Sequence, residues 1–135
     1  MYRRSIAAPS AAPSGFTITV KSSTTITASW QLPPANAQNG IIKGFKLFYK
    51  KKGSSGSQTM MLINDKAVRT ADVSGLSKYT EYEFQVLAFT SVGDGPKSTV
   101  KSETTKEDGR ILILIISKFY LLFLHKLLRR RPSLE

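Results

Sequence analysis

The stretch KYTEYEFQVLAFTSVGDGPKS, residues 78–98, contains the clearest fold signal in the chain. Its first half has an apolar side chain at every second position, namely Tyr82, Phe84, Val86 and Ala88. Because successive side chains of a β-strand point to opposite faces, this period of two predicts a half-buried strand over residues 82–89. The glycines and the proline of residues 90–97 predict a loop, followed by a strand over residues 98–103.

The same alternation continues towards the N-terminus and predicts five further strands. We expect them over residues 16–20, 26–30, 41–52 and 59–63, and in the segment that ends at Val73. Turn signals such as Asn39-Gly40 and Asn64-Asp65 separate them. Seven short strands with no amphipathic helix between them predict an all-β fold, a seven-stranded antiparallel sandwich of two facing sheets.

The strand phase also predicts which side chains fill the space between the sheets. Trp30 is the only tryptophan, and its burial contributes on the order of 2 to 3 kcal/mol. We expect the structural core to contain these side chains of the predicted strands: Trp30, Phe45, Leu47, Tyr49, Tyr82, Phe84 and Val86. The family resemblance described below adds Leu76, which lies between two predicted strands.

The residues at these spacings resemble a fibronectin type III domain over residues 13–105. The resemblance rests on Pro13, on Trp30 followed by Pro33-Pro34, on Asn39-Gly40, on the run from Gly44 to Tyr49, on Leu76, Thr80 and the strand over residues 82–89, and on Gly93, Gly95 and Ser98. Lys78 departs from the pattern, because the family often has proline there. Residues 78–98 and the closing TTKED are most similar to modules of neuronal immunoglobulin-superfamily receptors, such as Down syndrome cell adhesion molecule and the netrin-receptor and protogenin group. A tyrosine corner is expected at Tyr82, with its hydroxyl bonded to the backbone near Leu76.

The composition excludes most catalytic and metal-binding chemistry. The 135 residues include no cysteine and one histidine, His125, so disulfides, zinc-thiolate clusters and cysteine nucleophiles cannot form. The acidic residues before residue 105 show no pair placed for general acid and base roles. We therefore expect no enzymatic activity, no cofactor and no metal site.

The net charge of +11 favours acidic partners, and it is shared between residues 1–105 (+7) and residues 106–135 (+4). Charge alone does not choose between nucleic acid, sulfated glycan and anionic lipid, and nucleic acid has no other support here. Four lysines form a candidate anionic-ligand patch that could bind a sulfated glycan: Lys46, Lys50, Lys51 and Lys52. The alternative is that these strand lysines keep the sheet soluble and block edge-to-edge pairing.

The remaining segments have different compositions. Residues 1–12 contain no apolar run of signal-peptide length and are rich in Ala, Pro and Ser, which predicts a flexible leader. A linker over residues 106–110 precedes an 18-residue hydrophobic segment, 111–128, and a basic tail, 129–135. The hydrophobic segment is expected to be helical and is a candidate membrane anchor, represented by Ile111, Leu112, Phe119, Leu124 and Leu128. Lys118 weakens this interpretation, and an appendage without a role or an amphipathic surface helix are the alternatives.

These observations together predict a non-enzymatic protein-recognition module of the cell-adhesion or receptor type. We expect the chain to be a fragment or an isoform of a larger receptor. Its protein partner is not identified by the sequence. The alternatives are a passive structural spacer and a basic binder of sulfated glycan. The resemblance implies a membrane protein with the module outside the cell, whereas the missing signal sequence leaves the sidedness open.

Overall fold

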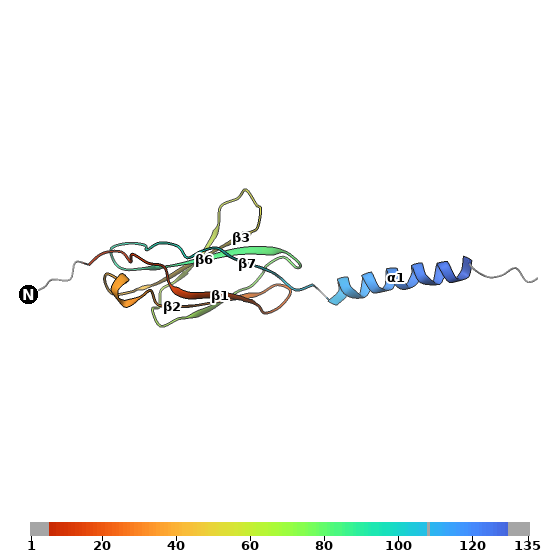
Figure 1. Ribbon diagram of the computed structural model, residues 1–135, viewed down its shortest axis with the longest axis horizontal. Coiled ribbons are helices and arrows are strands. Elements are labelled where there is room, and N and C mark those ends of the chain that lie inside the picture. The colour runs from red at the N-terminus through yellow and green to blue at the C-terminus, as the bar shows by residue number, and fades with distance from the viewer. Residues whose placement is uncertain (1–5, 108, 130–135) are drawn as a thin grey trace, which may run out of the picture.

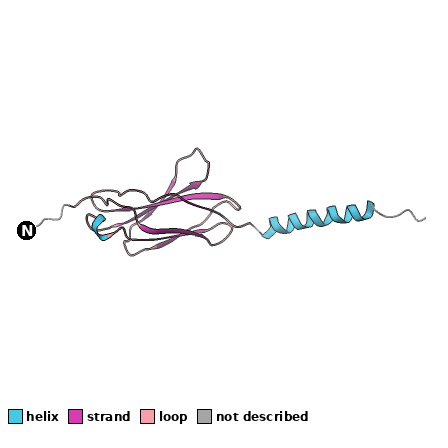
Figure 2. Ribbon diagram, in the orientation of Figure 1, coloured by secondary structure: helices cyan, strands magenta, loops and turns pink. Residues whose placement is uncertain are grey.

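The computed structural model describes residues 6–107 and the backbone of residues 109–129, with side chains of the latter from Ile115 onward. Figure 1 shows a two-layered sandwich followed by a helix, and Figure 2 shows strands and loops in the sandwich together with a short helical turn, η1. The described residues form these elements: β1 (Ser14–Val20), β2 (Ile26–Gln31), η1 (Ala35–Ala37), β3 (Gly44–Lys51), β4 (Thr59–Ile63), β5 (Thr70–Val73), β6 (Glu81–Phe89), β7 (Lys101–Thr104) and α1 (Gly109–Arg129).

The strands form two antiparallel sheets. One has the order β1-β2-β5, and the other has the order β4-β3-β6-β7. The longest ladder joins β3 to β6 and runs from the pair Gly44–Phe89 to the pair Lys51–Tyr82. This arrangement confirms the predicted all-β sandwich with seven strands among the described residues.

The core lies between the two sheets. Seven of the eight side chains predicted for it are buried, and Tyr49 is half-buried at its border, stacked on Phe84 at a centroid distance of 5.8 Å. Trp30 is 1% exposed, and its ring lies 5.4 Å from that of Phe45. The indole N–H of Trp30 has no hydrogen-bond partner among the described residues, so this side chain stabilises the fold through packing.

A hydrogen-bonded network ties the turn before β6 to the end of β7. The backbone N–H of Ser77 donates to the Tyr82 hydroxyl oxygen at 2.8 Å, the bond expected of a tyrosine corner. The Thr105 hydroxyl donates to the Ser77 carbonyl oxygen at 2.7 Å and accepts the backbone N–H of Thr80 at 3.0 Å. Thr105 is almost fully buried, so its hydroxyl is a structural group of the sandwich.

Residues 6–12 differ from the predicted flexible leader, because they are fixed along the end of the sandwich. The Ala7 N–H donates to the Asn39 carbonyl oxygen, and the Ala7 carbonyl oxygen accepts the hydroxyl of Thr90, at 2.8 and 2.9 Å. The Ser10 N–H donates to the Ala37 carbonyl oxygen at 2.8 Å. Residues 6–12 are thus ordered despite their low content of large apolar side chains, because their backbone groups form hydrogen bonds with two loops of the sandwich. Residues 1–5 lie outside the described residues.

The helix α1 covers the predicted hydrophobic segment and lies apart from the sheets in Figure 1. Every side chain described on it, from Ile115 to Arg129, is exposed. Within the described residues, no helix combines the length and the apolar character needed to cross a membrane. The predicted membrane anchor covers residues 111–128, and the side chains of residues 111–114 lie outside the described residues, so the anchor stays a prediction.

Candidate recognition surface

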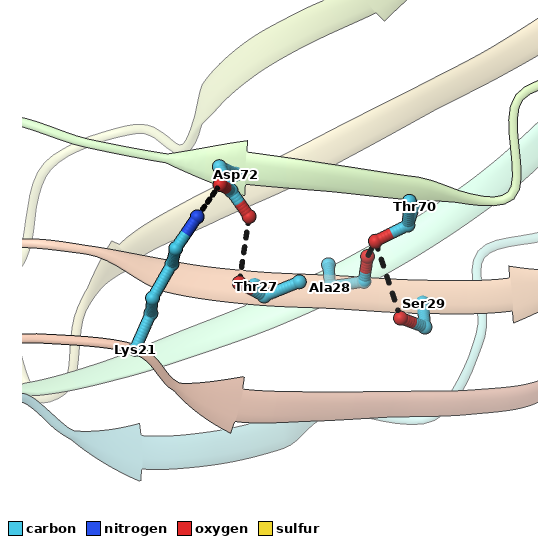
Figure 3. A network of polar contacts seen from close by, with 6 residues as sticks. All are labelled: Lys21, Thr27, Ala28, Ser29, Thr70 and Asp72. Atoms are coloured by element: carbon cyan, nitrogen blue, oxygen red, sulfur yellow. Dashed lines mark hydrogen bonds and ion pairs between the residues drawn. The ribbon is translucent and has the colours of Figure 1, made fainter.

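The outer face of the three-stranded sheet is polar, and its groups on β2 and β5 bond one another and Lys21 (Figure 3). Asp72 accepts hydrogen bonds from the Lys21 ammonium and the Thr27 hydroxyl, both at 2.6 Å. The Thr70 hydroxyl donates to the Ala28 carbonyl oxygen at 3.1 Å and accepts from Ser29 at 3.3 Å. The bonds from Lys21 and Thr27 lower the pKa of Asp72 and keep it charged. The polar groups on β2 and β5 therefore bond one another, whereas Thr17 and Thr19 of β1 are exposed to solvent on the same face.

The outer face of the four-stranded sheet has a different character. Cross-strand pairs place Leu62 and Leu87 on either side of Lys46, and Met60 and Gln85 on either side of Phe48. We call these residues, together with Lys50, the β4 face: Lys46, Phe48, Lys50, Met60, Leu62, Gln85 and Leu87. Met60 and Leu62 are 46% and 49% exposed, while Leu87 is buried. On this face, the exposed side chains of β4 are apolar, whereas the adjacent strand β3 carries the cations Lys46 and Lys50.

The loop that follows β6 is attached to the β4 face. The Lys97 ammonium lies 4.0 Å from the centroid of the Phe48 ring and donates to the Gln58 side chain at 2.8 Å. The Gln58 side-chain amide donates in turn to the side-chain oxygen Oε1 of Gln85 at 3.0 Å. These contacts place a cation on an aromatic ring in the middle of the face.

The four lysines of the predicted patch do not converge on one site. Lys46 forms an ion pair with Asp94 at 2.9 Å, and Lys52 forms one with Glu81 at 2.9 Å. The hydrogen bond and the charge of Glu81 raise the pKa of Lys52, and the same contact lowers the pKa of Glu81. Two of the four charges are thus already compensated.

The other two lysines point in different directions. Lys50 donates only at 3.5 Å, to the Ser54 carbonyl oxygen. Lys51 is exposed and pairs in register with the inward-facing Tyr82. Successive residues of a strand point to opposite faces of the sheet. Lys50 and Lys51 therefore do not form a joint binding site for one anion.

A second apolar surface lies at the loop end of the sandwich, where the chain enters. Ile6 and Ile41 are 65% and 66% exposed there, and they line a hollow together with Asn39 and Ser91. Neither isoleucine was singled out from the sequence, because Ile6 falls in the presumed leader and Ile41 in the presumed strand. Its apolar walls lie beside the backbone carbonyl and side-chain amide of Asn39, which already form hydrogen bonds with Ala7 and Ala8.

The residues of the candidate membrane segment show no organised site. Phe119, Leu124 and Leu128 are exposed on α1, whereas the side chains of Ile111 and Leu112 lie outside the described residues. The described residues contain no group of three potential metal-binding side chains. His125 lies exposed on α1, far in sequence from the sandwich.

Comparison with known proteins places the sandwich in a family. The family model for the fibronectin type III domain matches residues 11–104. Chicken sidekick-1 is 40% identical over 102 residues, which cover 75% of this chain and 5% of that protein. Mouse neogenin is 36% identical over 101 residues, covering 74% and 7%, and fruit-fly tyrosine-protein phosphatase Lar is 40% identical over 101 residues, covering 74% and 5%.

Solved structures agree with this assignment. The solution structure of the fibronectin type III domain of human contactin 1 superposes with a TM-score of 0.67 at 22% identity, covering 81% of this chain and 88% of that one. The curated relatives are far longer, and this chain matches at most 7% of those named above. The match to Lar is confined to this small part of the phosphatase, so it brings no catalytic function with it. The resemblance seen in the sequence is thereby confirmed, and the chain belongs to the fibronectin type III domain family.

Proposed function

We propose that this chain is a non-enzymatic protein-recognition module of the cell-adhesion or receptor type, derived from a larger receptor. Its relatives sidekick and neogenin are cell-adhesion or receptor proteins. The same relationship supports a location of the module outside the cell. The matched region is a small fraction of each relative, so the activity of the whole relatives is not carried over.

The observation that supports recognition over a passive spacer is the difference between the two outer faces. A spacer needs only solvated faces, such as the polar face of the three-stranded sheet, where the groups on β2 and β5 bond one another. The β4 face instead exposes Met60 and Leu62 beside lysines on a rigid sheet. Exposed apolar groups rimmed by polar ones are typical of protein interaction sites. A sulfated glycan is less favoured as the ligand, because Lys46 and Lys52 already have acidic partners.

The test uses the intact chain, clustered on streptavidin so that weak binding becomes measurable. Binding to cultured neurons is compared before and after trypsin treatment and before and after heparinase treatment. A protein-recognition module should lose binding with trypsin and keep it with heparinase. Absence of binding would favour the spacer, and sensitivity to heparinase alone would favour the glycan ligand.

Two matched variants locate the surface in the same assay. Met60→Lys places a charge on the β4 face and should reduce binding at least fivefold. Thr19→Lys places the same charge on the exposed outer face of β1 and should leave binding unchanged. Equal binding by both variants and the unmodified chain would exclude the β4 face as the recognition surface.

A further inference from the structure

The strand β4 is an edge strand of the four-stranded sheet without the usual protection against pairing. Edge strands are commonly protected by charges, by bulges or by short length. Among the described edge strands, the four-residue β5 has Asp72, and the four-residue β7 has Lys101 and Glu103. The ladder of β1 is interrupted between Ser14 and Thr17. The five residues of β4, TMMLI, have neither a charge nor a register shift.

The backbone of β4 is fixed in place by its neighbour, so it can serve as a template. All five of its residues pair with β3, from Phe45–Ile63 to Tyr49–Thr59. At Gly44 the two strands approach so closely that a Cβ atom there would collide with the Ile63 carbonyl oxygen. An added strand would therefore meet an ordered row of backbone groups.

The side chains along this edge specify apolar partners on one face. Met60 and Leu62 are on the outer face of β4, two residues apart, and each is about half exposed. A strand added beside β4 would place its own alternate side chains opposite them, at the contact distance of cross-strand pairs. Apolar residues at these two positions would remove this surface from water.

The charges at one end of β4 specify an acidic group. Lys97 contacts Gln58, the residue that precedes β4, and Lys50 follows the Tyr49–Thr59 pair at the same end. Neither lysine has an ion pair among the described residues. The excess positive charge of the module disfavours a second copy of the chain at this edge, because the copies would repel each other. A partner with carboxylates would be attracted instead.

We propose that the free edge of β4 binds an extended segment of a partner protein as an additional strand, with two apolar side chains opposite Met60 and Leu62 and a carboxylate at the Lys50 and Lys97 end. Main-chain hydrogen bonds provide affinity in this mode, and the side chains provide specificity. This inference rests on the proposed protein-recognition function, and it adds that the partner contributes an extended segment with apolar and acidic side chains.

The test uses two synthetic heptapeptides, Ac-TVTVTET-NH2 for antiparallel pairing and Ac-TETVTVT-NH2 for parallel pairing, added at millimolar concentration to the intact chain. Hydrogen–deuterium exchange measured by mass spectrometry follows the amides of each segment. One of the two peptides should slow exchange in residues 58–64 at least threefold and leave β1 and β5 unchanged. The counterparts with lysine in place of glutamate should have at least fivefold weaker effects.

Variants separate this inference from the proposed function. Leu62→Lys should abolish the slowing, whereas Thr19→Lys should leave it unchanged. If neither peptide slows exchange in residues 58–64, strand addition at β4 is excluded, even if Met60→Lys still reduces binding to neurons. If the peptide effect is present while the chain binds no neurons, strand addition stands and the proposed adhesion role fails.

Discussion

Replacement of Thr105 by valine should lower the free energy of unfolding by about 2 to 3 kcal/mol. The hydroxyl makes two short hydrogen bonds inside the fold, to the Ser77 carbonyl oxygen at 2.7 Å and from the Thr80 N–H at 3.0 Å. Each such bond contributes about 1 kcal/mol, and the backbone groups left without a partner add to the cost. Valine preserves the branched shape, so little packing is lost. With a urea dependence of about 1 to 1.5 kcal/mol per molar, the unfolding midpoint should fall by about 2 M.

Urea unfolding followed by the fluorescence of Trp30, the only tryptophan and a buried one, measures this shift directly. Thr105→Ser is the matched control, because it keeps the hydroxyl and removes one methyl group, which costs about 1 kcal/mol. A loss below about 0.5 kcal/mol for Thr105→Val would refute the role given to the hydroxyl. Tyr82→Phe should cost about 1 to 2 kcal/mol. Because both hydroxyls bond Ser77, the double variant should lose less than the sum of the single losses.

Three further predictions address packing and charge. Trp30→Ala should cost about 3 to 5 kcal/mol by emptying the centre of the core, and a loss below about 1 kcal/mol in a urea melt would contradict its burial. Gly44→Ala should cost more than about 2 kcal/mol in the same melt, since its Cβ would collide with the backbone of Ile63, and an unchanged midpoint would contradict that close approach. The pKa values of Asp72 and Glu81 are lowered in the folded state, so their stabilising effect is present above their ordinary values of 3.8 and 4.5 and is lost as the pH falls below them. Thermal melts between pH 6 and 2 should show this loss, and Asp72→Asn should flatten the profile; an unflattened profile would assign the acid sensitivity to other groups.

The strands and the core could be predicted because they depend on short-range patterns. The alternation through Trp30, Phe45 and Phe84 defines a buried face without any knowledge of the partner strand, and all three are fully buried. Thr105 was missed because a threonine near the end of a strand is common, and its burial depends on a turn 25 residues away. Residues 6–12 were missed for the same reason, since their partners are in loops far along the chain.

The candidate surface was only partly predictable. The sequence located the lysines on β3, but the compensation of Lys46 and Lys52 depends on acids 48 and 29 residues away. The exposure of Met60 and Leu62 follows from the position of β4 at the edge of its sheet. Strand order results from the topology of the whole domain, and period-two alternation alone does not determine it.

The attachment of residues 7–10 to the loop end affects how the module responds to mechanical force. In Figure 1 the chain enters the sandwich at one end and continues into α1 at the other, so a pull on both sides runs along the strands. The bonds of Ala7 and Ser10 to Asn39, Thr90 and Ala37 bear that load on the N-terminal side, and the bonds of Lys106 to Ser22 and Tyr79 bear it on the other side. Rupture of the bonds on the N-terminal side would lengthen the tether by several residues before the sheets separate. The module would thus have a short extensible segment in series with the sandwich, and release of that segment would uncover the loop end around Asn39 and Thr90.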